Sequence, residues 1–112
     1  SLELREQLRA SLGDTPQTLR DLSVCLTRLG DAERDAGKLA EALRLHRESL
    51  QLDRELRNLL GDTPQVLRDI RSSLSAVLAL EQQLGQANQP GDQEELSEIS
   101  RRLDQAALTE QQ

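Results

Sequence analysis

The strongest constraint on the fold of this chain is an internal repeat. Residues 1–22 align with residues 49–70, and the hexapeptide LGDTPQ is identical in both copies. The leucines at positions 2, 4, 8 and 12 recur at positions 50, 52, 56 and 60. A repeat of this length in a leucine-rich chain indicates supersecondary units that stack, each burying its apolar face against the next.

The residues available for a core favour helical units. The chain has 112 residues, of which 36% are hydrophobic, and it contains no Phe, Tyr, Trp or Met. A core must therefore consist of leucine with some Ile, Val and Ala; leucine favours helices, and the residues typical of sheets are scarce. No stretch alternates polar and apolar residues for long, as a strand would. We expect one all-α domain, because the chain is too short for two independent ones.

Residues 15–60 predict a complete helical hairpin. Thr15 is the expected N-cap, with Pro16 in the first helical turn. A stripe of leucines follows at helical spacing, at Leu19, Leu22, Leu26 and Leu29. Gly37 is the expected turn, and the second helix covers about residues 38–60. The apolar arc of that helix is wide enough to contact neighbours on two sides.

Gly30 interrupts the leucine stripe of the first helix. An isolated glycine inside a helix costs about 1 kcal/mol relative to alanine. Unlike Gly13 and Gly61, it is not followed by Thr-Pro, so we place it within the helix rather than at its end. We infer that another helix approaches closely there, with Ala42 as the expected contact.

The flanking segments predict partial units. Residues 1–13 match the end of the second helix and predict a partial repeat. Residues 63–112 predict a degenerate hairpin or capping helices: a third helix to Gly85, a loop over 86–91, and a final helix opened by a capping box of Asp92 and Glu95. Its apolar stripe comprises Leu96, Ile99, Leu103 and Ala106. The whole chain is expected to contain about five helices.

Charge and composition argue against several classes of partner. The net charge of −6 repels phosphate backbones, and the lack of aromatic side chains removes any stacking platform for bases, so nucleic acid is not expected. No apolar run approaches the ~20 residues of a membrane span. The single cysteine, Cys25, excludes an internal disulfide and fits a reducing compartment, so a cytoplasmic location is expected.

The sequence offers little material for catalysis or metal binding. Cys25 and His46 are each the only residue of their type, and both are expected to pack in the core or at its boundary. Asp31 and Asp35 lie one helical turn apart, but hard cations require more oxygen ligands than these supply. We therefore predict no catalytic residues, no metal site and no cofactor, and a protein that is not an enzyme.

The hairpin resembles a known helical repeat. Leu26, Leu29-Gly30, Gly37, Ala42, Ser49 and Leu52 match in order and spacing the pattern of the tetratricopeptide repeat (TPR), in the long-helix form found in bacterial signalling proteins. Glu33 and His46 stand where that family often has aromatic residues, and Leu78 occupies the small slot matched to Gly30. The resemblance implies antiparallel helical hairpins stacked as a short solenoid, with one good repeat over residues 19–52.

The resemblance also implies a binding surface. In TPR proteins the first helix of each hairpin lines a concave groove that holds a partner peptide. The matching positions are Val24, Thr27, Asp31, Arg34 and Asp35 in the first unit, and Ser72, Ser75, Ala79, Gln82 and Gln83 in the second. Some TPR domains grip a C-terminal carboxylate with Lys and Asn at such positions. None of these positions holds either residue, so acidic tails of that kind are not the expected ligand.

Three hypotheses about function follow. The leading one is a non-catalytic scaffold module that binds a partner peptide or domain through the concave helix face. The first alternative is a structural element that self-associates into a homo-oligomer through exposed leucines. The second alternative is a regulatory part of a larger multidomain signalling enzyme.

Overall fold

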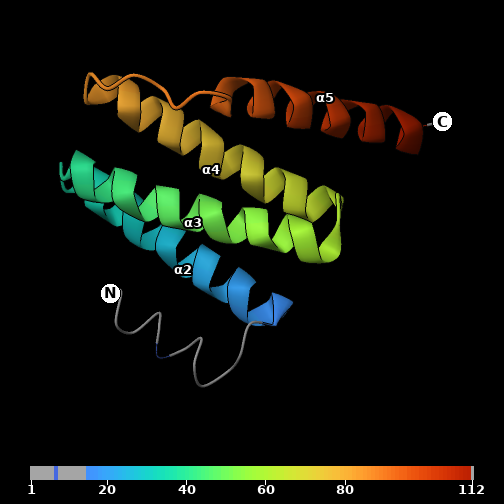
Figure 1. Ribbon diagram of the computed structural model, residues 1–112, viewed down its shortest axis with the longest axis horizontal. Coiled ribbons are helices and arrows are strands. Elements are labelled where there is room, and N and C mark those ends of the chain that lie inside the picture. Colours follow the sequence, from blue (N-terminus) through green and yellow to red (C-terminus); the bar gives the residue numbers. More distant parts are fainter. Residues whose placement is uncertain (1–6, 8–14, 112) are drawn as a thin grey trace.

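The computed structural model describes Gln7 and residues 15–111 of the chain. Residues 15–111 contain four helices, α2 (Pro16–Asp35), α3 (Leu39–Leu60), α4 (Pro64–Gln83) and α5 (Asp92–Gln111), and no strand. Consecutive helices run antiparallel and pack side by side in a row (Figure 1). The all-α prediction is confirmed, whereas the partial repeat expected over residues 1–13 lies almost wholly outside the described residues.

The two copies of the repeated sequence begin α2 and α4 in the same way. The hydroxyl of Thr15 accepts a hydrogen bond from the Thr18 amide at 3.2 Å, and the hydroxyl of Thr63 accepts one from the Val66 amide at 3.2 Å. In each case a proline occupies the first turn, where a backbone N–H would have no partner within the helix, so its absence costs no hydrogen bond. The identical caps start α2 and α4 as parallel helices that both pack against α3.

The core is built from leucine stripes, as the composition requires. Helix α3 lies between α2 and α4, and its buried residues cover a wide arc that includes Ala42, Leu43, Leu45, Leu50, Leu52 and Leu56. The prediction that this helix contacts neighbours on two sides is therefore confirmed. Leu29, which the sequence places in the stripe of the first helix, is 45% exposed, and Leu59 near the end of α3 is 57% exposed.

The exposure of Leu29 follows from where Gly30 points. Gly30 is buried and faces α3, and a residue one position earlier is rotated by about 100° away from that contact. A Cβ atom at Gly30 would lie 2.7 Å from Nε2 of His46, so the close approach predicted at this glycine is confirmed. The atoms nearest to this Cβ belong to the imidazole of His46 rather than to Ala42, the residue expected from the sequence.

The two residues with candidate chemistry differ in burial. His46 is 1% exposed, as predicted for a packing residue. Cys25 is exposed, so the prediction that it packs in the core or at its boundary was wrong. Cys25 immediately precedes the buried Leu26, and the rotation of about 100° per residue turns it towards solvent.

Helix α5 packs on α4 and is displaced along it. Residues 84–91 carry the chain part of the way back before α5 begins, so the C-terminal end of α5 extends past the α3–α4 turn (Figure 1). Ile99 is fully buried, with Leu96 and Leu103 partly buried beside it, which confirms the apolar stripe.

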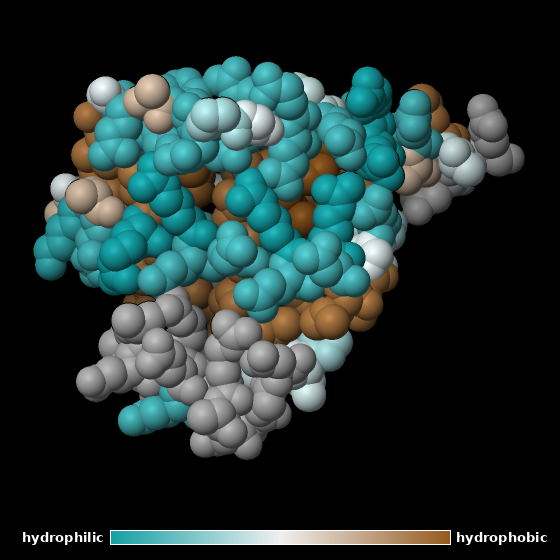
Figure 2. Space-filling view, in the orientation of Figure 1, coloured by the Kyte–Doolittle hydropathy of each residue, from teal (hydrophilic) through white to brown (hydrophobic). Residues whose placement is uncertain are grey.

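The carboxylates of the predicted capping box tie α5 to α3. Asp92 and Glu95 both accept hydrogen bonds from Nη2 of Arg54, at 3.2 Å and 2.6 Å. The capping box is thus replaced by an ion-pair cluster between two helices. The face of the molecule shown in Figure 2 is largely hydrophilic, with apolar residues visible in the hollows between polar side chains.

Candidate functional site

A groove lies between α2 and α4, with α3 as its floor. Its central cavity has a volume of about 250 Å³. It is lined from α2 by Arg20, Ser23, Val24, Thr27 and Arg28, from α3 by Asp53, and from α4 by Asp69, Ser72 and Ser73. A second cavity of about 150 Å³ shares Arg20 and Asp69 with the first and continues to Pro16 and Thr63, the first turns of the two helices.

Asp53 joins the three helices at the bottom of this groove. It is only 2% exposed. Ser23 of α2 donates to its Oδ1 at 2.5 Å, and Ser73 of α4 donates to its Oδ2 at 2.8 Å. One carboxylate on α3 therefore contacts both walls of the groove, which fixes the distance between α2 and α4.

The environment of Asp53 disfavours its ionised form. Burial raises the pKa of Asp53, and the hydrogen bonds from Ser23 and Ser73 oppose that shift. The negative charge of nearby Asp69 raises the pKa further, and Arg20 lowers it. Within the described part of the chain no basic side chain forms a salt bridge with Asp53, and its direct hydrogen-bond partners are the hydroxyl groups of Ser23 and Ser73.

A chain of hydroxyl groups leads from Asp53 to the edge of the groove. Ser23 Oγ lies 2.8 Å from Ser49 Oγ on α3, and Ser49 Oγ lies 2.9 Å from Thr27 Oγ1 on α2. Ser49 is fully buried, whereas Thr27 is half-buried and lines the cavity. The buried carboxylate is thus connected to a surface hydroxyl through hydrogen bonds.

The structure brings together part of the predicted binding surface. Val24, Thr27 and Ser72 line the central cavity, from opposite walls. The other seven predicted residues line neither cavity of the groove; these are Asp31, Arg34, Asp35, Ser75, Ala79, Gln82 and Gln83. The cavities extend along α2 as far as Arg28 and along α4 as far as Ser73, and the seven remaining positions lie beyond these residues.

Asp31 has a different environment from the groove residues. Its Oδ1 lies 3.3 Å from Nε2 of His46 and 3.6 Å from the guanidinium of Arg34. Burial lowers the pKa of His46, and the charge of Asp31 partly offsets this effect. The pair Asp31 and Asp35 does not gain a third ligand, since no group of three or more His, Cys, Asp or Glu residues suited to a metal ion occurs in the described residues.

Sequence reasoning missed most of the polar lining of the groove. The omitted residues are Arg20, Ser23, Arg28, Asp53, Asp69 and Ser73. A signal was available for two of them. Ser23 adjoins Leu22 of the leucine stripe, so its side chain could have been expected near the core. Asp53 lies between Leu52 and Leu56 in the apolar arc of α3, and a charge buried there requires hydrogen-bond partners. The pairing of Asp53 with two different helices could not be read from the sequence.

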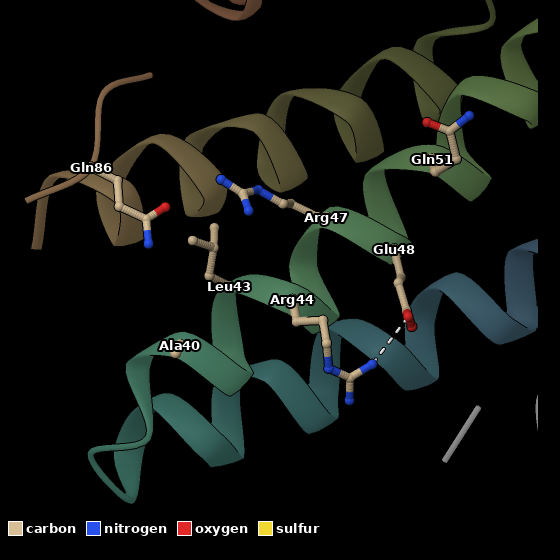
Figure 3. Close-up of a pocket in the computed structure, with 7 residues that line it drawn as sticks. All are labelled: Ala40, Leu43, Arg44, Arg47, Glu48, Gln51 and Gln86. Atoms are coloured by element: carbon tan, nitrogen blue, oxygen red, sulfur yellow. Dashed lines mark hydrogen bonds and ion pairs between the residues drawn. The ribbon is translucent and has the colours of Figure 1, made fainter. Parts of the chain in front are cut away.

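Two further cavities lie along a different part of α3. One, of about 350 Å³, is lined by Ala40, Leu43, Arg44, Arg47, Glu48 and Gln51 of α3 with Gln86 from the loop before α5 (Figure 3). The adjoining one, of about 400 Å³, shares Arg47 and Gln51 with it. The guanidinium of Arg47 bonds at 2.8 Å to Glu81, which is fully buried, so this arginine serves the packing of α3 on α4.

No known protein family, curated protein or solved structure matches this chain. Among the described helices, none combines the length and apolar character needed to cross a membrane. The candidate site is therefore assigned from the groove itself, from its shape and its buried polar floor.

Proposed function

We propose that this chain is a protein–protein interaction module that binds a partner peptide or domain in the groove between α2 and α4. The observation that carries the proposal is the cavity in which Val24 and Thr27 of one wall face Ser72 of the other. A TPR-like solenoid arrangement, a cytoplasmic location and the absence of catalysis, metal, cofactor and nucleic-acid binding belong to the same proposal.

The groove has the properties of a preformed binding surface. Its walls are two parallel helices held against α3 by the leucine core, and Asp53 fixes their separation through Ser23 and Ser73. Partners bind well to surfaces that need little reorganisation, because less conformational entropy is lost on binding. Val24 provides an exposed apolar contact in the middle of a polar lining.

Capture of partners by groove variants tests this proposal. The parent protein carrying Val24→Glu or Ser72→Glu is used as bait and compared with the wild type in quantitative pull-downs. Both positions are exposed, so the variants should fold normally, which far-UV circular dichroism checks. Cys25→Glu on α2 and Gln105→Glu on α5 are controls with the same added charge at exposed positions outside the groove.

We expect both groove variants to lose partners that both controls retain. A long charged side chain at the centre of an interface should weaken binding about tenfold or more, because it fills part of the cavity that the partner would occupy and loses hydration on binding. Partners retained by the two groove variants, or lost equally by the controls, would refute the groove as the binding surface.

Self-association is the second candidate, and exposed leucines favour it. Leu29, Leu59, Leu60 and Leu108 are between 45% and 61% exposed. Exposed apolar side chains mark an interface where they form a contiguous patch. Light scattering over a range of protein concentrations distinguishes the two candidates, since a concentration-independent monomer would exclude self-association. The regulatory role within a larger enzyme remains the third hypothesis.

A further inference from the structure

We propose that the central cavity of the α2–α4 groove binds the basic head of an arginine or lysine side chain from the partner, above Asp53. This inference rests on the proposed function, because it names the chemistry that the groove would recognise. It is carried by the uncompensated carboxylate at the bottom of the cavity and by the direction of the hydrogen bonds that surround it.

Asp53 is a buried carboxylate that forms no salt bridge with any basic side chain among the described residues. Buried carboxylates are normally paired with a cation, because hydroxyl groups alone replace only part of the lost hydration. Each oxygen of Asp53 accepts one hydroxyl hydrogen bond, from Ser23 and from Ser73, and a carboxylate oxygen can accept two. The remaining acceptor capacity lies at a cavity that Asp53 itself lines.

Because of this chain of hydrogen bonds, the other hydroxyl groups at the bottom of the cavity can only accept hydrogen bonds from a ligand. With Asp53 ionised, Ser23 uses its only hydroxyl hydrogen on Asp53. Ser49 must then donate its one hydroxyl hydrogen to Ser23, either to the hydroxyl or to the backbone carbonyl, so Thr27 must donate to Ser49. Ser73 likewise uses its hydrogen on Asp53. Only lone pairs of Thr27 and Ser73 therefore remain for a ligand in the cavity.

A group that only donates hydrogen bonds and carries a positive charge fits this floor. Guanidinium and ammonium groups have N–H donors and no acceptors, whereas a carboxylate or phosphate on this floor would meet lone pairs and the charge of Asp53. The two cations that line the cavity, Arg20 and Arg28, lie on its α2 wall. Asp69 at the edge of the cavity adds a second negative charge. The net charge of −6 attracts basic partners over longer distances.

Arg20 is the internal competitor for this position. It is exposed, lines both cavities of the groove and already acts on Asp53 through its charge. Arg28 lines the same cavity on the other side of Val24. Both have long, flexible side chains that can extend into water. A ligand cation can therefore displace their guanidinium groups from the cavity without any movement of the backbone. Removing Arg20 should therefore strengthen binding of a cation.

Titration with small probes tests the inference on the intact chain. Isotope-labelled protein is titrated with Nα-acetyl-arginine amide and, separately, with its citrulline counterpart, which has nearly the same shape without the charge. We expect the arginine probe to shift backbone amide signals of Ser23, Thr27, Ser72 and Ser73, with an affinity about tenfold higher than that of citrulline.

Variants identify the groups responsible. Asp53→Asn should reduce the affinity for the arginine probe to that for citrulline, and Thr27→Val should weaken it about threefold or more by removing an acceptor. Arg20→Gln should strengthen it. Asp104→Asn and Thr109→Val, at exposed positions of α5, are matched controls that should leave binding unchanged. If Asp53→Asn does not fold, Thr27→Val and Arg20→Gln still decide the outcome.

Three results would overturn the inference. Equal binding of both probes in the groove would refute the preference for a cation while retaining the groove as a binding surface. Arginine-induced shifts outside the groove, or no shifts at all, would refute the cation site. The pull-down comparison would then still show whether the groove binds a partner by other contacts. Unchanged arginine binding in both Asp53→Asn and Thr27→Val would show that the buried network plays no part.

Discussion

Replacing Gly30 by alanine tests how α2 packs on α3. A Cβ atom at Gly30 would lie 2.7 Å from Nε2 and 2.8 Å from Cδ2 of His46. Unstrained contacts between such atoms lie at about 3.5–4.0 Å. His46 is 1% exposed, so its ring can avoid the clash only by moving against the side chains packed around it. Overpacking costs about 1–3 kcal/mol, and the better helix propensity of alanine returns about 1 kcal/mol. We expect the free energy of unfolding to fall by up to about 2 kcal/mol.

The same substitution should have the opposite effect once the imidazole is removed. In the His46→Ala background the space next to Gly30 is empty, so Gly30→Ala should stabilise the protein by about 1 kcal/mol through helix propensity. The coupling energy of this double-mutant cycle should then be about 1–3 kcal/mol. If the effect of Gly30→Ala on stability changes sign between the wild-type and the His46→Ala backgrounds, the effect comes from a steric contact with His46. A general effect on the helix would be the same in both backgrounds.

Urea unfolding followed by far-UV circular dichroism measures the four free energies. Intrinsic fluorescence is unsuitable, because the chain has no aromatic residue of the Phe, Tyr or Trp type. The dependence on urea concentration should be the same in all four proteins, as expected when only stability changes. Stabilisation by Gly30→Ala in both backgrounds would refute the packing of His46 against this glycine.

Two further predictions concern buried charges. Because burial raises the pKa of Asp53 in the folded state, the stability that its neutral form provides is fully present below pH ~3.8 and is lost as the pH rises through the raised pKa. Asp53→Asn should therefore stabilise the fold near neutral pH and remove this part of the pH dependence of stability, as measured by urea unfolding. A destabilised variant whose stability keeps the pH dependence of the wild type would contradict this prediction. Arg47→Met should destabilise by about 1–3 kcal/mol, because Glu81 would stay buried without its cation. Adding Glu81→Gln should recover much of the loss in thermal unfolding, and no recovery would show that the loss came from packing of the arginine stem.

The sequence predicted the helices well because their signals are local. The Thr-Pro pairs at positions 15–16 and 63–64 specify N-caps that the structure reproduces with the same hydrogen bond. Glycines beyond the last apolar residues mark helix ends, and Gly37 and Gly61 do adopt the positive φ that other residues avoid. Leucine spacing then indicated which face of each helix is buried. Errors occurred at positions such as Leu29, where the rotation of the helix by one residue decides whether a side chain is buried or exposed.

The groove was only partly predictable, because its lining depends on contacts between helices. Val24, Thr27 and Ser72 were identified through the TPR resemblance, whereas Asp53 was not, although it is the residue that connects both walls. A serine, a threonine or an aspartate in a helix gives no local sign of its partner, because the partner lies at least 20 residues away in the sequence.

By itself, the sequence determined that this protein is helical, where its helices begin and end, and that two of them start from the same repeated motif. These properties depend on backbone propensities and capping groups within a few residues of each other. Only the tertiary structure decided that His46 faces Gly30 and that Asp92 and Glu95 bind Arg54 rather than cap their own helix. It also decided that a single buried carboxylate spans the groove. The physical reason is that relative rotation and displacement of packed helices select among many contacts that the same leucine stripes would allow.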